Sequence, residues 1–123
     1  FKGAESLGFR GQLTLDFPHD KCFRFIQDKV AKSTAVHIIV VTHHVPSFQL
    51  ASPDFAGSKI NGAFTVELEQ YIETSPVEYW IYGHSHRNID KVIGKTKCVS
   101  NQLGYVFHNE HHTFNPEKAI EVQ

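Results

Sequence analysis

Residues 77–86 read Val-Glu-Tyr-Trp-Ile-Tyr-Gly-His-Ser-His, and they predict a strand that runs directly into a glycine and two histidines. The apolar and aromatic run 77–82 is typical of a strand. In an extended segment, residues i and i+2 project to the same side, so His84 and His86 would face one site. Gly83 allows the sharp turn that this position needs. Two imidazoles at that spacing could each bind one ion of a metal pair.

A second run with the same form lies earlier in the chain. Residues 37–42 read His-Ile-Ile-Val-Val-Thr, a continuous β-branched segment that predicts a strand covered on both faces. It ends at His43 and His44. Because ligand sites gather at the carboxyl ends of strands in open α/β sheets, two strands that end in histidines indicate one cluster. The alternative, that His43 and His44 are loop residues held by hydrogen bonds, stays open on these residues alone.

The remaining periodicity predicts a mixed α/β fold, and the length of residues 1–123 suits one domain or part of one. Apolar residues recur at helical spacing over 18–32 and over 61–74, where Asn61 is a candidate N-cap. Strands are expected at 91–93 and 97–101, joined by a hairpin turn at Gly94-Lys95. Edge strands are expected at 12–15 and 120–122. The expected aromatic core comprises Phe23, Phe25, Phe64, Trp80 and Tyr82.

Composition limits the class of partner. The 123 residues carry a formal net charge of -1, so no basic excess points to nucleic acid or an anionic membrane. No apolar run approaches the roughly 20 residues that span a bilayer. The two cysteines, Cys22 and Cys98, are expected to be ordinary thiols. Because the chain begins at Phe1 and has no methionine, we expect a piece of a longer or processed protein. We expect a cytoplasmic location, and a removed signal peptide stays open as the alternative.

The two histidine segments together resemble a known family. The segment Val40-Val41-Thr42-His43-His44-Val45-Pro46-Ser47, followed by Tyr82-Gly83-His84-Ser85-His86, is similar to the last two motifs of the calcineurin-like metallophosphoesterases. Residues 55–57, 61–64, 101–105 and 114–116 resemble one bacterial-type branch, so the similarity runs from about residue 36 to 122. The resemblance implies the C-terminal half of a four-layer α/β/β/α sandwich with a mixed sheet.

The resemblance also implies roles for the matched residues. His43 and His84 would bind one metal ion and His86 the other, and His43 is preferred to His44 because it continues directly from the strand. His44 would then support the ligands or contact the substrate. The parent enzyme would hold two divalent ions of the Mn, Fe or Zn type. It would hydrolyse a phosphomonoester or phosphodiester with metal-activated water.

The chain departs from the family pattern in one respect. The upstream Asp-x-His, Gly-Asp-x-x-Asp and Gly-Asn-His-Asp/Glu motifs, which supply the bridging carboxylate, further ligands and a histidine for the leaving group, are absent. We therefore expect at most one bound ion, of the zinc or nickel type that imidazoles prefer. We expect no catalytic residue in this chain and little activity without an N-terminal half of the same domain. Loss of that half would expose a sheet edge and favour dimerisation.

Other polar residues have weaker assignments. His108, His111 and His112 are expected on a solvated face. Arg87 would be a surface residue or a contact to substrate phosphate. Asn101 and Tyr105 would either support the site or pack in the hairpin.

Two other functions remain open. A non-catalytic metal-binding or interaction module would use the same histidines without hydrolysis. A plain structural domain would bind no metal above background. The sequence preceding Phe1 distinguishes the enzyme from both, because the three upstream motifs would stand there.

Overall fold

The computed structural model describes residues 17–50 and 68–122, and the chain divides into two compact units, residues 1–34 and 35–123. In the first unit, α1 spans Phe17–Lys32, which confirms the helix predicted over 18–32. Lys29 and Lys32 lie in its last turn, where positive charge stabilises the helix dipole. Lys32 also pairs with Asp28 at 2.9 Å. The side chains of Phe23 and Phe25 are only half-buried, so the prediction that they belong to the core is wrong.

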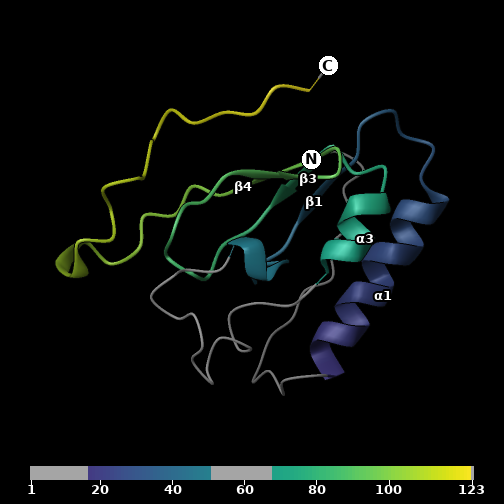
Figure 1. Ribbon diagram of the computed structural model, residues 1–123, viewed down its shortest axis with the longest axis horizontal. Helices are drawn as coiled ribbons and strands as arrows, with labels where there is room; N and C mark the ends of the chain where they lie inside the picture. Colours follow the sequence, from purple (N-terminus) through teal and green to yellow (C-terminus); the bar gives the residue numbers. More distant parts are fainter. Residues whose placement is uncertain (1–16, 51–67, 123) are drawn as a thin grey trace. The chain divides into compact units, whose positions relative to one another are not determined.

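The second unit is built on a four-stranded mixed sheet (Figure 1). Its strands are β1 (Ile39–Val41), β2 (Tyr79–Ile81), β3 (Lys91–Ile93) and β4 (Thr96–Val99), in the order β1-β2-β4-β3. The β1–β2 and β2–β4 pairs are parallel, and the β3–β4 pair is antiparallel. This arrangement confirms the α/β class and the mixed sheet.

The β3–β4 hairpin turns at the predicted dipeptide. Gly94 has a φ of 61°, a left-handed conformation that glycine adopts without steric cost. A Cβ at this position would lie 2.5 Å from the carbonyl oxygen of Glu73. Glycine is therefore required both by the turn and by the close approach of the preceding helix.

That helix, α3, spans Glu69–Thr74 and contacts β3 (Figure 1). It coincides with the end of the helix predicted over 61–74; residues 61–67, with Asn61 and Phe64, lie outside the described residues. The hydroxyl of Thr96 donates to the carbonyl of Val77 at 2.8 Å and lies 3.4 Å from that of Ile72. This buried hydroxyl joins the end of α3 to the start of β4.

The core of the second unit centres on Trp80, which is fully buried together with Val45, Leu50, Ile72, Val77 and Cys98. The indole Nε1 of Trp80 donates to Thr42 Oγ1 at 3.0 Å, so its one polar atom is satisfied. Burial raises the pKa of the Cys98 thiol to about 11, so this cysteine stays protonated. Trp80 and Tyr82 are buried as predicted.

Two predicted strands differ from the structure. Among the described strands β1 lies at one edge, and Val41 is 69% exposed, so the prediction of a strand covered on both faces is wrong. Residues 118–122 form no strand, and the prediction for 120–122 is also wrong. Side-chain contacts hold that segment instead, because Lys118 pairs with Asp90 at 2.7 Å. The segment predicted at 12–15 lies outside the described residues.

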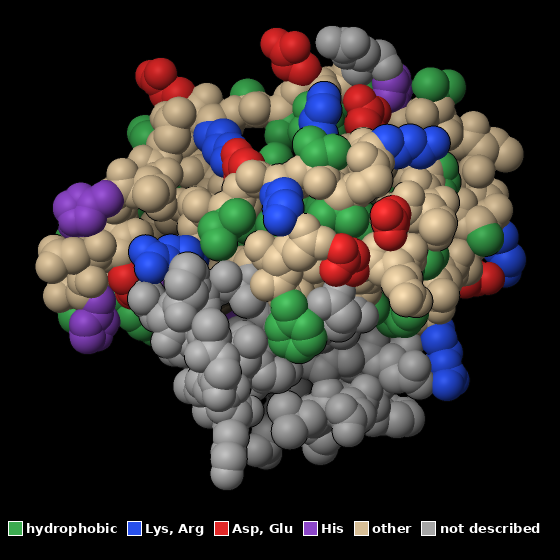
Figure 2. Space-filling model, in the orientation of Figure 1, with side chains coloured by type: hydrophobic (Ala, Val, Ile, Leu, Met, Phe, Trp, Pro, Cys, Tyr) green, Lys and Arg blue, Asp and Glu red, His purple; other side chains and the backbone are tan. Residues whose placement is uncertain are grey.

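Charge is mixed over the visible surface. Figure 2 shows Lys, Arg, Asp and Glu side chains interspersed on the face it views, without a region of one sign. None of the helices described here has the length and apolar composition to cross a membrane.

The turn at Gly94 provides a test of the hairpin. We expect Gly94→Ala to lower the free energy of unfolding by about 1–3 kcal/mol, because it combines positive φ with a backbone clash. Urea denaturation measures the change. Lys95→Ala, in the same turn, is the matched control and should change it by less than about 0.5 kcal/mol. Equal stability of the two variants would contradict the assigned turn.

Candidate functional site

The histidines of the two motifs meet at the carboxyl ends of β1 and β2. Backbone pairing continues past the strands, because Thr42 N–H donates to Ile81 O at 2.9 Å and Gly83 N–H donates to His43 O at 3.0 Å. His43 therefore lies beside Gly83, and His84 follows at once. This is the carboxyl-end position that the sequence predicted for the cluster.

The imidazoles of His43 and His84 face each other. His43 Nε2 lies 2.7 Å from His84 Nδ1, although 41 positions separate the residues. At this distance one nitrogen carries a proton and donates a hydrogen bond, and the other nitrogen accepts that bond. The ring of His44 completes a cluster, with centroids 5.2 Å from His43 and 4.8 Å from His84. The structure thus brings together three of the histidines that the sequence singled out.

The segment 83–86 is not extended, so the predicted i, i+2 projection of His84 and His86 is wrong. His84 has a φ of 68° and His86 a φ of 54°. Between them, the N–H of the buried Ser85 donates to the carbonyl of Gly83 at 2.8 Å. Residues other than glycine rarely adopt positive φ, and such strain is concentrated at functional sites. Two strained histidines separated by one residue indicate that their orientation has a role.

Gln102 holds this strained segment. Its Oε1 accepts the N–H of His86 at 2.7 Å, while its Nε2 donates to Ser85 Oγ at 3.1 Å and to Arg87 O at 2.9 Å. Its own backbone pairs with the side chain of Asn88, through Gln102 N–H to Oδ1 at 2.6 Å and Nδ2 to Gln102 O at 3.0 Å. The sequence did not predict these roles of Gln102 and Asn88, because hydrophobic periodicity does not indicate which backbone groups an amide side chain will contact.

His86 has different neighbours from His84. Its Nδ1 lies 3.4 Å from Glu110 Oε2, and its ring meets that of Tyr105 edge to face at 4.7 Å. Gly104 permits this packing, because a Cβ there would lie 2.6 Å from the Cβ of Glu110 and 3.4 Å from that of His86. Glu110 is a carboxylate beside the cluster that the sequence did not predict. The signal available was the glycine at 104, which marks a close approach.

The other predicted residues lie elsewhere. Asn101 supports the C-terminal segment, with hydrogen bonds of 2.6 and 2.9 Å to the backbone of Asn115. Arg87 is exposed, as are His108 and His112, in agreement with a solvated position. His111 differs, because its Nδ1 is buried and has no hydrogen-bond partner among the described residues. The predicted solvated position of His111 therefore holds only in part, since the residue is half-buried.

The electrostatics at His84 favour the neutral imidazole. Burial lowers the pKa of His84, and the neighbouring His43 and His86 lower it further. A neutral ring offers a lone pair, and that is the form that binds metal ions. A cation could therefore take the place of the proton that His43 Nε2 and His84 Nδ1 share.

The fit to a metal is partial. Within residues 17–50 and 68–122, no group of three or more His, Cys, Asp or Glu side chains is placed to hold a metal ion. His43 and His84 supply two facing nitrogens 2.7 Å apart. Tetrahedral zinc, with Zn–N bonds of about 2.0–2.1 Å, would require them to be about 3.3 Å apart. The described residues therefore fit two positions of one ion after a small opening, and do not fit a two-metal centre by themselves.

Comparison with known proteins leaves the family open. No protein-family model matches the chain, and no solved structure matches it significantly. The chain is 31% identical over 98 residues to a protein of Acanthamoeba polyphaga mimivirus whose name, Uncharacterized protein L509, states no activity. The match covers 74% of this chain and 34% of the viral protein. The chain thus spans about a third of the length of this relative.

The protonation of His84 is directly measurable. We expect its NMR titration midpoint to lie below the usual histidine value of about 6.5. His43→Gln removes a neighbouring charge and should raise the midpoint only in part, because burial is the larger cause. Since the unfolded chain binds this proton more readily, stability should fall as pH drops from about 6.5 to the folded midpoint. A midpoint at or above 6.5 would contradict the assigned environment.

The role of Gln102 is tested by hydrogen exchange. We expect Gln102→Ala to speed exchange of the His86 amide by about tenfold, because that N–H loses its acceptor. Asn101→Ala is the matched control: it removes two hydrogen bonds to Asn115 and should leave the His86 amide protected. Equal protection in the two variants would show that Gln102 does not hold the segment.

Proposed function

We propose that this chain is the C-terminal part of a metal-dependent phosphoesterase of the calcineurin-like type. The proposal includes the four-layer α/β/β/α sandwich, of which the mixed sheet and α3 would be one half. The observation that carries it is the pairing of His43 Nε2 with His84 Nδ1 at 2.7 Å, at the carboxyl ends of two adjacent parallel strands. Two motifs far apart in the sequence thus converge where a ligand site is expected.

The proposal gives the histidines distinct tasks. His43 and His84 would hold one metal ion, and His86 would contribute to the second. A bound metal pair would supply an activated water and neutralise phosphate charge. His44 is near both ligand rings, at 5.2 Å from His43 and 4.8 Å from His84, and is therefore suited to support them or to contact substrate.

The missing carboxylates limit what this chain does alone. A metal pair about 3.5–4 Å apart carries concentrated positive charge, and bridging carboxylates normally neutralise it. Glu110 pairs with His86, and its Oε2 lies 3.4 Å from the ring Nδ1. We propose that in this position it does not act as the carboxylate that bridges two metal ions. We therefore propose that this chain binds one zinc-type ion weakly. Hydrolysis of a phosphomonoester or phosphodiester would need an N-terminal half.

Zinc calorimetry tests the metal site. We expect zinc to bind the unmodified chain, and His43→Ala and His84→Ala to weaken binding by at least about tenfold. His108→Ala and His112→Ala are matched controls, because both residues are exposed and lie outside the cluster; they should have no effect. The proposal fails if zinc does not bind, or if binding is lost only when His111 and His112 are replaced.

Activity is tested in a longer polypeptide. A protein that joins this chain to an N-terminal half carrying the three missing motifs should hydrolyse p-nitrophenyl phosphate in the presence of manganese, and His84→Ala should abolish turnover. Zinc binding without turnover in that protein would favour the alternative, a non-catalytic metal-binding module.

A further inference from the structure

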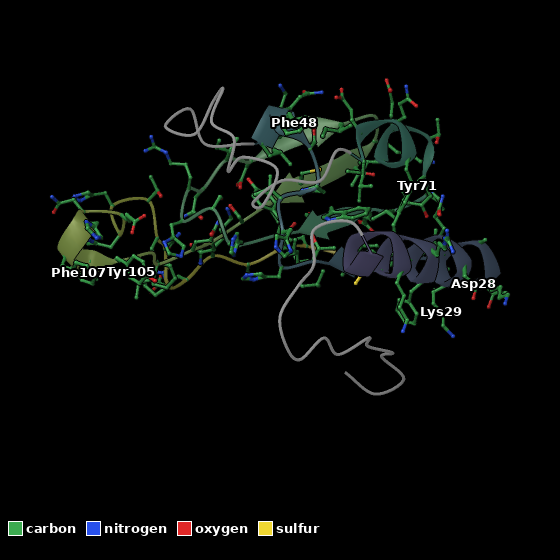
Figure 3. The ribbon with its side chains drawn as sticks, turned by 90° about the horizontal axis from the view of Figure 1, so that it is seen from below. Asp28, Lys29, Phe48, Tyr71, Tyr105 and Phe107 are labelled. Atoms are coloured by element: carbon green, nitrogen blue, oxygen red, sulfur yellow. The ribbon has the colours of Figure 1, made fainter. Side chains whose placement is uncertain are left out.

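An exposed aromatic stack lies beside His86. It consists of Tyr105, Phe107 and His108, around the short helix η3 (Val106–His108), and we call it the aromatic shelf. The rings of Tyr105 and Phe107 stack with centroids 5.2 Å apart and planes 27° apart. His108 lies 4.5 Å from Phe107. Figure 3 shows Tyr105 and Phe107 together at one end of the second unit, well separated from Phe48.

The exposure of the shelf has no explanation in the packing of the described chain. Phe107 is 77% exposed and Tyr105 is 52% exposed. Large aromatic side chains normally bury most of their surface, and contiguous exposed apolar side chains mark interaction sites. The neighbouring side chains of Leu103 and Val106 are also exposed, at 49% and 53%. The region therefore has the character of a binding surface.

The shelf is held in place by its backbone. The carbonyl of Tyr105 accepts the N–H of His108 at 3.0 Å and that of Glu110 at 3.2 Å. The N–H of Tyr105 donates to Glu110 Oε1 at 2.8 Å. Asn109 ends the helix in the left-handed conformation, with a φ of 58°. A ligand would meet rings that are already positioned, and that reduces the entropy lost on binding.

The shelf is continuous with the candidate site. Tyr105 meets the ring of His86 edge to face at 4.7 Å, and it also stacks on Phe107. Phe107 is thus two ring contacts away from His86, which is two residues along the chain from His84. One small molecule could reach both regions, with its polar group at the histidines and its planar group at the shelf.

We propose that the aromatic shelf binds the planar aromatic group of a phosphoester whose phosphate lies at the histidine cluster. The inference rests on the proposed function, and it adds a substrate class: a nucleotide-like or aryl phosphoester in preference to an aliphatic one. Every aromatic base has a face that stacks, so such a shelf selects for planarity without reading hydrogen bonds. Phe107 and Tyr105 are the residues that would determine the preference.

Comparison of two phosphates tests the shelf. Adenosine 5′-monophosphate and ribose 5-phosphate share the sugar phosphate and differ in the base. We expect the full chain, in the presence of zinc, to bind the adenosine compound about tenfold more tightly in calorimetry, because one stacked base contributes about this much. In saturation-transfer NMR, the adenine protons should receive magnetisation from the ring protons of the unmodified chain.

Two variants at one position separate ring stacking from apolar area. Phe107→Ala and Phe107→Leu should both bring the affinity ratio of the two phosphates close to one, since leucine keeps apolar surface and lacks a ring. Phe48→Ala is the matched control: Phe48 is also an exposed phenylalanine, at 51%, in the short helix η1 (Phe48–Leu50). It should leave the ratio at about ten.

The outcomes distinguish the shelf from the site. Zinc-dependent binding of ribose 5-phosphate with a ratio near one in the unmodified chain would overturn the shelf and leave the phosphate site intact. Absence of zinc-dependent binding of either phosphate would overturn the proposed function, and the inference with it. If the affinity ratio of the two phosphates stays near ten in Phe107→Ala, the assignment to the shelf is overturned. The same holds if Phe48→Ala also brings that ratio to one.

Discussion

The in-register parallel pairing of β1 with β2 brings His43 and His84 of the candidate site together. It aligns Val41 with Ile81, and the hydrogen bonds Thr42 N–H to Ile81 O and Gly83 N–H to His43 O extend it beyond the strands. A shift of one residue would turn every side chain of the shifted strand to the opposite face. The 2.7 Å contact between His43 and His84 therefore depends on this register. The buried Trp80 reinforces it, since its indole donates to Thr42 from the neighbouring strand.

Strain at the strand end is balanced by side-chain hydrogen bonds. His84 and His86 have positive φ, which is unfavourable for residues with a Cβ. The amide of Gln102 bonds to His86, Ser85 and Arg87 and so holds the backbone in that conformation. The pairing of β4 with β2 brings Gln102 there, because residue 102 follows β4. The central sheet thus positions the histidines and also the group that fixes their backbone.

The two histidines of residues 84–86 have chemically different neighbours. Burial and adjacent histidines keep His84 neutral, whereas His86 has the carboxylate of Glu110 beside it at 3.4 Å. Tyr105 links His86 to the exposed ring of Phe107. A polar group of histidines and an exposed aromatic surface are therefore adjacent, as the proposed phosphoester site requires. This is the arrangement expected of a site that holds a charged group and a planar group of one ligand.

The sequence by itself determined the elements whose signals are local. The strand at 77–82, the helix at 18–32 and the hairpin at Gly94-Lys95 follow from apolar periodicity and turn chemistry, and the histidines at two strand ends predicted the cluster. Only the tertiary structure decided the exposure of Val41, the positive φ of His84 and His86, and the roles of Gln102 and Glu110. The physical reason is that these features depend on contacts between residues distant in sequence. Hydrophobic periodicity predicts which face of a helix or strand is apolar. It does not predict which side chains from distant parts of the sequence will contact that face.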